Sequence, residues 1–165
     1  ALPILLETSR LWREVAQDMA PRYPEVELEF MFVDNAAMQI IQRPTHFDVI
    51  VTENLFGDIL TDESSVISGS LGMLPSASVG AKVALFEPIH GSYPQAAGKN
   101  IANPMATILS AAMMLEHVGL EKEGKAIRDA VNKAIEAGVV TEDLVSAGGK
   151  AASTTEVGDF VATAV

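Results

Sequence analysis

The chain alternates between two kinds of apolar pattern, and this alternation limits its fold more than any other feature. Short apolar runs predict strands at 3–7, 26–33, 47–52 and 83–88. Segments with apolar residues at helical spacing predict helices at 8–20, 35–43, 55–68, 104–117, 122–137 and 154–165. Strands that alternate with helices along a chain predict an α/β fold.

The charge balance and the missing cysteines exclude several classes of function. The 165 residues hold 11 Lys and Arg against 22 Asp and Glu, which gives a formal charge of −11. A surface of this sign gains nothing from nucleic acid or an anionic membrane, so neither is expected as a partner. The absence of cysteine excludes a disulfide, a thiolate nucleophile and a cysteine-ligated zinc site. With no apolar run near the roughly 18 residues that span a bilayer, a cytoplasmic protein is the simplest interpretation.

Two aspartates stand four residues apart in the stretch ENLFGDILTDE (53–63). On a helix this spacing places Asp58 and Asp62 on one face, where their charges repel each other unless a cation lies between them. Carboxylate oxygens suit Mg²⁺ or Mn²⁺, which take few ligands from the protein and leave the rest to substrate and water. The alternative is a solvated acidic face, with Glu53 favoured by the helix dipole and Glu63 facing water.

A third carboxylate, Asp34 in VDNAA, follows the predicted strand 26–33 and precedes a predicted helix. One interpretation is structural, because Asp is favoured as a helix cap. The other is functional, because ligands collect at the carboxyl ends of strands in α/β sheets.

The segment EPIHGSYPQAAGKNIANP (87–104) is too rich in Gly and Pro for regular structure. Loops of this length in a compact chain are usually functional. Gly91 and Gly98 permit a close approach of the backbone to a ligand, and a helix that opens after Asn103 presents backbone N–H groups to anions. The segment is neither a GxGxxG turn nor a P-loop, so an ordinary surface loop with a locally bonded His90 is the alternative.

These motifs together resemble a known family. FDVIVTENLFGDILTDESSVISGSLGMLPSAS, LFEPIHGS and AGKNIANPMATILSAAMMLEH are similar to the isocitrate/isopropylmalate family of metal-dependent β-decarboxylating dehydrogenases. The similarity runs from about Glu7 to the C-terminus, and NLFGDILTD and HGSYPQ favour the isopropylmalate branch. The resemblance implies a layered sheet with helices on both faces. It also implies a partial metal and dimerisation domain at 1–69 and a partial cofactor-binding domain at 70–165.

The resemblance assigns roles to individual residues. Asp58 and Asp62 look like ligands of Mg²⁺ or Mn²⁺. Asp34 looks like the acidic catalytic residue that completes the metal site of a neighbouring subunit. The residues similar to those around the adenosine of NAD are His90, Gly91, Ser92, Tyr93, Gln95 and Asn103, the last at the adenine.

The chemistry that the resemblance implies is an oxidative decarboxylation. Members of this branch oxidise 3-isopropylmalate with NAD in leucine biosynthesis. The metal binds the carboxylate and hydroxyl oxygens of the substrate and, after CO₂ leaves, stabilises the enolate as a Lewis acid. The alternatives are a relative that acts on tartrate or homoisocitrate, and a non-catalytic fragment or dimerisation module.

Position 95 bears on the choice of cofactor. NAD-specific members of the family carry Asp where this chain has Gln95. An Asp accepts hydrogen bonds from the adenosine ribose and repels a 2′-phosphate, whereas Gln can only form hydrogen bonds. NAD is therefore the expected cofactor, with weaker discrimination against NADP.

The start of the chain departs from the family pattern. The positions of a family Lys and Asn hold Leu2 and Ile4, and the first lysine in the chain is Lys82. The chain therefore resembles the C-terminal half of the enzyme, without the arginines, tyrosine and lysine of the preceding half. Because a sheet without its neighbours exposes edges and apolar faces, we expect this chain to be inactive alone. It would form a homodimer or require the missing N-terminal half.

Overall fold

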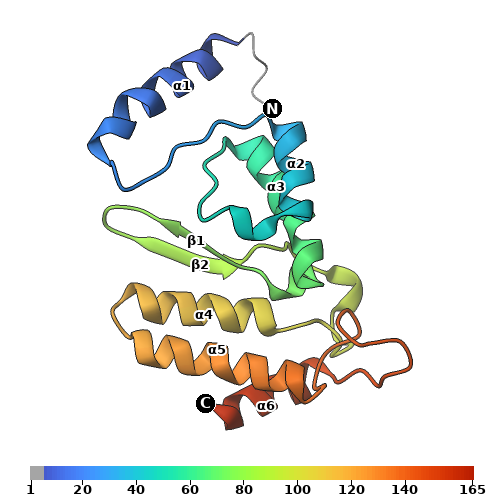
Figure 1. Ribbon diagram of the computed structural model, residues 1–165. Coiled ribbons are helices and arrows are strands. Elements are labelled where there is room, and N and C mark those ends of the chain that lie inside the picture. Colours follow the sequence, from blue (N-terminus) through green and yellow to red (C-terminus); the bar gives the residue numbers. More distant parts are fainter. Residues whose placement is uncertain (1–5) are drawn as a thin grey trace. The chain divides into compact units, whose positions relative to one another are not determined.

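The structure, a computed structural model, describes residues 6–165 and separates into two compact units. The first unit ends at Ser64 and the second is Ser65–Val165. The division falls inside helix α3 (Asn54–Ser68) (Figure 1). The assignment of 1–69 and 70–165 to two family domains concerns a larger protein and stays a prediction.

The first unit consists of helices joined by irregular segments. Its described elements are α1 (Glu7–Met19), η1 (Ala20–Arg22), α2 (Val33–Gln42), η2 (Pro44–His46) and the first part of α3. The three helices predicted in this region are confirmed, each within two residues of its expected bounds. Pro44 explains the end of α2, because the residue before a proline is disfavoured in the helical conformation. Arg43 accordingly leaves the helix, with φ −142° and ψ 58°.

The core of the first unit is small. Ala36 and Ile40 of α2 and Leu60 of α3 are its buried apolar residues, and partly buried side chains pack around them from Met31, Val33, Ala37 and Phe47. α2 and α3 lie side by side through this cluster (Figure 1). Many other large apolar side chains of this unit remain exposed, among them Leu11, Trp12, Val15, Leu28, Phe30, Phe32, Val49, Val51, Leu55 and Ile59.

The strands predicted at 26–33 and 47–52 are wrong for this chain. Residues 26–32 and 47–53 are irregular, and α2 begins at Val33. A strand requires a neighbour to complete its hydrogen-bond ladder, and within residues 6–165 the only ladder joins two other segments. The apolar side chains therefore stay in solvent, with Val49 82% and Val51 74% exposed. The strand predicted at 3–7 falls mostly outside the described residues, as do Leu2 and Ile4, and Glu7 belongs to α1.

The second unit combines a β-hairpin with three helices. After η3 (Leu71–Met73) come β1 (Pro75–Val79), β2 (Ala84–Pro88), η4 (Pro94–Ala96), α4 (Met105–His117), α5 (Glu121–Glu136) and α6 (Thr154–Ala164). The strand predicted at 83–88 and the three helices are confirmed. Within the described residues the sheet is limited to these two strands, so this chain holds a mixed helical and β part of the expected fold.

The partner of β2 was not predicted. β1 and β2 pair antiparallel from Pro75↔Pro88 to Val79↔Ala84. Backbone hydrogen bonds continue the pairing at both ends, from Ile89 N to Leu74 O (3.1 Å) and from Gly80 N to Val83 O (2.9 Å). The sequence PSASV lies in a Gly- and Ser-rich stretch and lacks the β-branched and aromatic residues typical of strands. Pairing with β2 therefore overrides its weak local preference.

The core of the second unit lies among its three helices. Its buried apolar residues are Met105, Leu109, Ala130, Val131, Ala134, Val140, Val157 and Val161. α4 and α5 lie side by side next to the hairpin, and α6 packs against α5 (Figure 1). α6 begins with a capping box, in which Ser153 accepts from the Glu156 backbone and the Glu156 carboxylate accepts from Ser153. This core is the larger of the two and fixes the start of α4.

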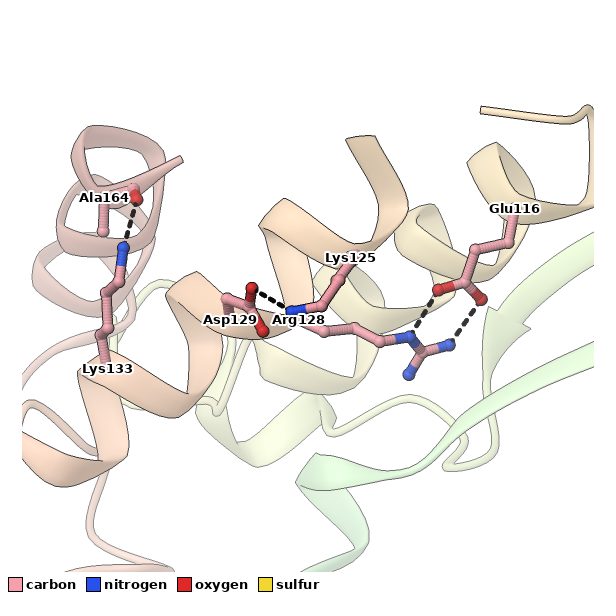
Figure 2. Close-up of polar contacts among 6 residues, drawn as sticks. All are labelled: Glu116, Lys125, Arg128, Asp129, Lys133 and Ala164. Carbon is pink, nitrogen blue, oxygen red and sulfur yellow. Dashed lines mark hydrogen bonds and ion pairs between the residues drawn. The ribbon is translucent and has the colours of Figure 1, made fainter. Parts of the chain in front are cut away.

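A glycine and an ion pair hold α4 against α5. A Cβ on Gly124 of α5 would lie 2.9 Å from the carbonyl oxygen of Ala112 in α4. Arg128 then reaches back to Glu116 with two parallel hydrogen bonds of 2.7 and 2.9 Å (Figure 2). This pairing is bidentate, the strongest geometry for arginine and a carboxylate. The hydrogen bond to Arg128 lowers the pKa of Glu116.

The outer face of α5 adds further polar contacts. Lys125 pairs with Asp129 one turn along (2.5 Å), and the Lys133 ammonium donates to the carbonyl of Ala164 at the end of α6 (3.1 Å) (Figure 2). A cation at a helix C-terminus is favoured by the helix dipole.

Within residues 6–165, none of the helices combines the length and the apolar character that a membrane crossing requires.

The substitution Gly124→Ala is expected to destabilise the second unit. Alanine is the better helix former by about 1 kcal/mol, but its Cβ would collide with backbone of α4, and overpacking of this kind costs about 1–3 kcal/mol. Gly158→Ala in α6 is the matched control, because nothing lies within 4 Å of the added Cβ. Urea unfolding followed by circular dichroism should show a loss for Gly124→Ala and a gain for Gly158→Ala. A gain in both variants would contradict close packing at Gly124.

Candidate functional site

The structure places Asp58 and Asp62 in α3, both exposed and four residues apart. The helix starts with a cap from Glu53, whose two carboxylate oxygens accept from the backbone N–H groups of Leu55 and Phe56, each at 3.0 Å. The prediction that Glu53 serves the helix start is therefore confirmed. With that start fixed, the helical spacing puts Asp58 and Asp62 on one side of α3.

Asp34 lies in the first turn of α2 and is exposed. Its carboxylate accepts from the backbone N–H of Asn35 (2.8 Å), and Phe32 holds the N-cap position. Asp34 is thus a first-turn residue, where a negative charge suits the helix dipole, and the structural interpretation of Asp34 as the N-cap is wrong. Within residues 6–165 no three acidic or histidine side chains gather closely enough to hold a metal ion. The α3 pair alone offers two oxygen ligands.

The predicted cofactor loop follows β2 directly. His90 is half-buried and its Nδ1 lies 3.0 Å from the carbonyl oxygen of Gly91, so the expected local bonding of this histidine is present. The other predicted residues of the loop are exposed and available to a ligand: Gly91, Ser92, Tyr93 and Gln95. Ala96, in η4, is buried at 6% exposure and anchors the middle of the loop.

The second half of the loop is fixed to the start of α6. Asn100 has a left-handed backbone, with φ 56°, a conformation that Asn tolerates better than most residues. Its carbonyl accepts from the backbone N–H of Thr154 (3.0 Å). Its side-chain oxygen accepts from the backbone N–H (3.1 Å) and the hydroxyl (3.0 Å) of Thr155. These hydrogen bonds fix the position of the loop at Asn100, shortly before α4 begins.

Asn103 stands at the opening of α4 with its side chain engaged at both ends. Its Oδ1 accepts from the backbone N–H of Met105, the first residue of α4 (2.9 Å), and Pro104 occupies the N-cap position, so Asn103 is not the N-cap itself. Its Nδ2 donates to the carboxylate of Asp143 (2.9 Å). Gly72 packs against this side chain, since a Cβ there would lie 2.7 Å from the Asn103 Cβ.

Asp143 is the residue that the sequence did not reveal. Besides Asn103, it accepts hydrogen bonds from the hydroxyls of Ser70 and of Thr141, the latter at 2.5 Å. Partial desolvation by the surrounding protein would raise its pKa, but the hydrogen bonds from Ser70, Thr141, Asn103 and its own backbone outweigh this effect. They hold the pKa below the ordinary aspartate value. Its donors come from three separate segments, so no short motif marks it.

Comparison with known proteins identifies sequences similar to this chain. The profile of the family described as isocitrate/isopropylmalate dehydrogenase matches residues 4–161. The 3-isopropylmalate dehydrogenase of Bacteroides fragilis (strain YCH46) is 59% identical over 157 residues, 95% of this chain and 44% of the relative. That of Desulfitobacterium hafniense (strain Y51) is 57% identical over 98% of this chain and 46% of the relative. That of Bacillus subtilis (strain 168) is 62% identical over 85% and 39%.

Solved structures give the same relationship. An isocitrate dehydrogenase from Methylococcus capsulatus superposes with a TM-score of 0.91 at 41% identity, over 98% of this chain and 47% of that chain. A β-decarboxylating dehydrogenase from Thermococcus kodakarensis superposes with a TM-score of 0.84 at 39% identity, over 97% and 46%. The chain spans less than half the length of the curated relatives described above.

The stability contributed by Asp143 should depend on pH in a defined direction. Its folded pKa lies below the ordinary value of 3.8. A carboxyl group of this kind stabilises the fold above its unfolded pKa and loses that contribution as the pH falls through the folded pKa. The melting temperature of the wild-type chain should therefore fall more steeply than that of Asp143→Asn between about pH 5 and pH 2. A gap between the two melting curves that stays constant across this range would contradict the assignment.

Proposed function

We propose that this chain, which belongs to the isocitrate/isopropylmalate dehydrogenase family, is the C-terminal part of a 3-isopropylmalate dehydrogenase. The complete cytoplasmic enzyme would oxidise and decarboxylate 3-isopropylmalate with NAD and Mg²⁺ or Mn²⁺ in leucine biosynthesis. The observation that carries the proposal is the 57–62% identity to enzymes of that name over 85–98% of the chain. The lower identity of 41% to an isocitrate dehydrogenase favours the isopropylmalate branch.

The acidic pair on α3 fits a divalent cation. Asp58 and Asp62 are exposed carboxylates at i, i+4 spacing on a helix with a capped start. Mg²⁺ and Mn²⁺ accept a small number of carboxylate ligands and complete their coordination with substrate oxygens and water. We propose these two residues as ligands, with Asp34 of a neighbouring subunit completing the site. When bound, the ion supplies Lewis-acid stabilisation of the enolate that forms as CO₂ leaves.

The loop between β2 and α4 fits the adenosine part of a dinucleotide. Its exposed residues, Gly91, Ser92, Tyr93 and Gln95, line one continuous segment that ends at the opening of a 13-residue helix. We propose that His90 and these residues surround the adenosine and that Asn103 contacts the adenine. The exposed position of Gln95 leaves its amide free to bond to a ribose hydroxyl.

The complete enzyme requires more surface than this chain supplies. The first unit buries only a small apolar cluster and leaves aromatic and aliphatic side chains in water, including Trp12, Phe30 and Phe32 at 41–48% exposure. Apolar surface on this scale is characteristic of a protein interface. We propose that the missing N-terminal half and a second subunit of a homodimer cover it. The chain alone is then inactive, and a non-catalytic dimerisation module is the alternative for the isolated chain.

Metal binding by the isolated chain is expected to depend on the α3 pair. Titration calorimetry with Mn²⁺ should show saturable binding, and Asp58→Asn/Asp62→Asn should weaken it by at least about tenfold, since both anionic ligands are lost. The oligomeric state should be recorded on the same samples by light scattering.

The matched control is Asp18→Asn/Asp48→Asn, which removes two exposed carboxylates from the same unit. Equal weakening by both double variants would contradict a specific site on α3. Absence of binding in the wild-type chain would show that the metal site requires the rest of the enzyme, and the family assignment would stand.

Position 95 should set the discrimination between cofactors. Gln95→Asp is expected to reduce the affinity for 2′-phospho-ADP-ribose by about tenfold relative to ADP-ribose, because its carboxylate repels the 2′-phosphate. Gln95→Asn keeps an amide and should leave the ratio of the two affinities unchanged. An unchanged ratio in Gln95→Asp would contradict the placement of this residue beside the ribose.

A further inference from the structure

Three hydrogen-bond donors from different parts of the second unit converge on one carboxylate. Asp143 follows α5 and accepts from Ser70, 73 residues earlier in the chain, and from Asn103, 40 residues earlier. Thr141, almost fully buried, donates to its other oxygen at 2.5 Å. An ionised carboxylate accepts hydrogen bonds and donates none. The ionised Asp143 side chain can therefore accept from all three donors at once.

This arrangement fixes which way the Asn103 amide points. The carboxylate of Asp143 accepts only, so the group that faces it at 2.9 Å must be the Asn103 NH₂. The Asn103 oxygen then faces the backbone N–H of Met105 at 2.9 Å, which can only donate. Both partners demand the same orientation, and one N–H of the Asn103 amide is left for a ligand.

The segment before β1 also contacts Asp143 and Asn103. Ser70 accepts from the backbone N–H of Gly72 (3.0 Å) while its hydroxyl donates to Asp143. Gly72 in turn lies so close to the Asn103 side chain that even a methyl group would collide with it. The Asn103 side chain is thus confined by packing on one side and by hydrogen bonds at both ends of its amide.

We infer that Asp143 is a positioning residue of the cofactor site. It orients the Asn103 amide at the opening of α4 and thereby raises the affinity of this amide for an adenosine nucleotide. The identity of the ligand rests on the proposed function. The orientation of Asn103 rests on the hydrogen bonds and the packing of the second unit alone.

Substitutions at position 143 separate this role from a purely structural one. Asp143→Ala removes both acceptor oxygens and releases the Asn103 amide. Asp143→Asn keeps one oxygen that can still accept from Asn103, because the Thr141 hydroxyl can rotate and accept from the new NH₂. Glu142→Ala is the matched control, since it removes an exposed carboxylate from the adjacent position of the same loop.

The first measurement is the affinity of the full chain for ADP-ribose by titration calorimetry, at a temperature where circular dichroism shows each variant folded. Asp143→Ala should weaken binding about tenfold, as expected for one oriented hydrogen bond. Asp143→Asn should recover affinity to within about threefold, and Glu142→Ala should stay within about twofold of wild type. A lowered melting temperature with unchanged affinity in Asp143→Ala would overturn the inference.

The second measurement needs no variant. The side-chain NH₂ resonances of Asn103, followed by NMR during acidification of the wild-type chain, should shift with the same midpoint as the Asp143 carboxyl. If the chemical shifts of the Asn103 NH₂ group do not change as Asp143 titrates, the inference that Asp143 positions Asn103 is overturned. If the resonances respond and wild type does not bind ADP-ribose, the proposed cofactor site fails in this chain, and the ligand role of Asp143 fails with it.

Discussion

The contact between α4 and α5 is the constraint on which the second unit depends. Gly124 lets the two helix backbones approach more closely than any side chain would allow, and Arg128 fastens the same helices through Glu116. Met105, at the first turn of α4, is completely buried. Because α4 is held at both ends, its opening has a defined position, and the loop that ends at Asn103 acquires a defined position as well.

The two units differ in how much of their site they build themselves. In the second unit, hydrogen bonds from Thr154 and Thr155 fix the proposed cofactor loop at Asn100, and Asp143 accepts from the amide of Asn103. In the first unit, the acidic pair is arranged by the geometry of one helix over a small core. A preorganised site loses less entropy on binding, so the nucleotide site that we propose would require less from other chains than the metal site that we propose.

The sequence predicted what depends on local patterns and missed what depends on distant partners. All six helices and the strand at 84–88 follow from periodicity and turn residues. The runs at 26–33 and 47–52 have the composition of strands but find no ladder partner among residues 6–165, whereas β1 pairs despite a weak strand pattern. Asp143 could not be predicted because its role arises from donors that only the folded chain brings together. The roles of Asp34, Asp58 and Asp62 came from the family resemblance, because spacing alone favoured a solvated acidic face.

The claim that this chain is the C-terminal part of a decarboxylating dehydrogenase is tested most directly by complementation. The chain would be co-expressed with the part of the Bacillus subtilis relative that lies outside the matched region, and NADH formation measured with 3-isopropylmalate, NAD and Mn²⁺. NADH should form only when both parts are present, and it should be lost when this chain carries Asp58→Asn and Asp62→Asn. A stable complex of the two parts that forms no NADH, or activity that survives the double substitution, would contradict the account.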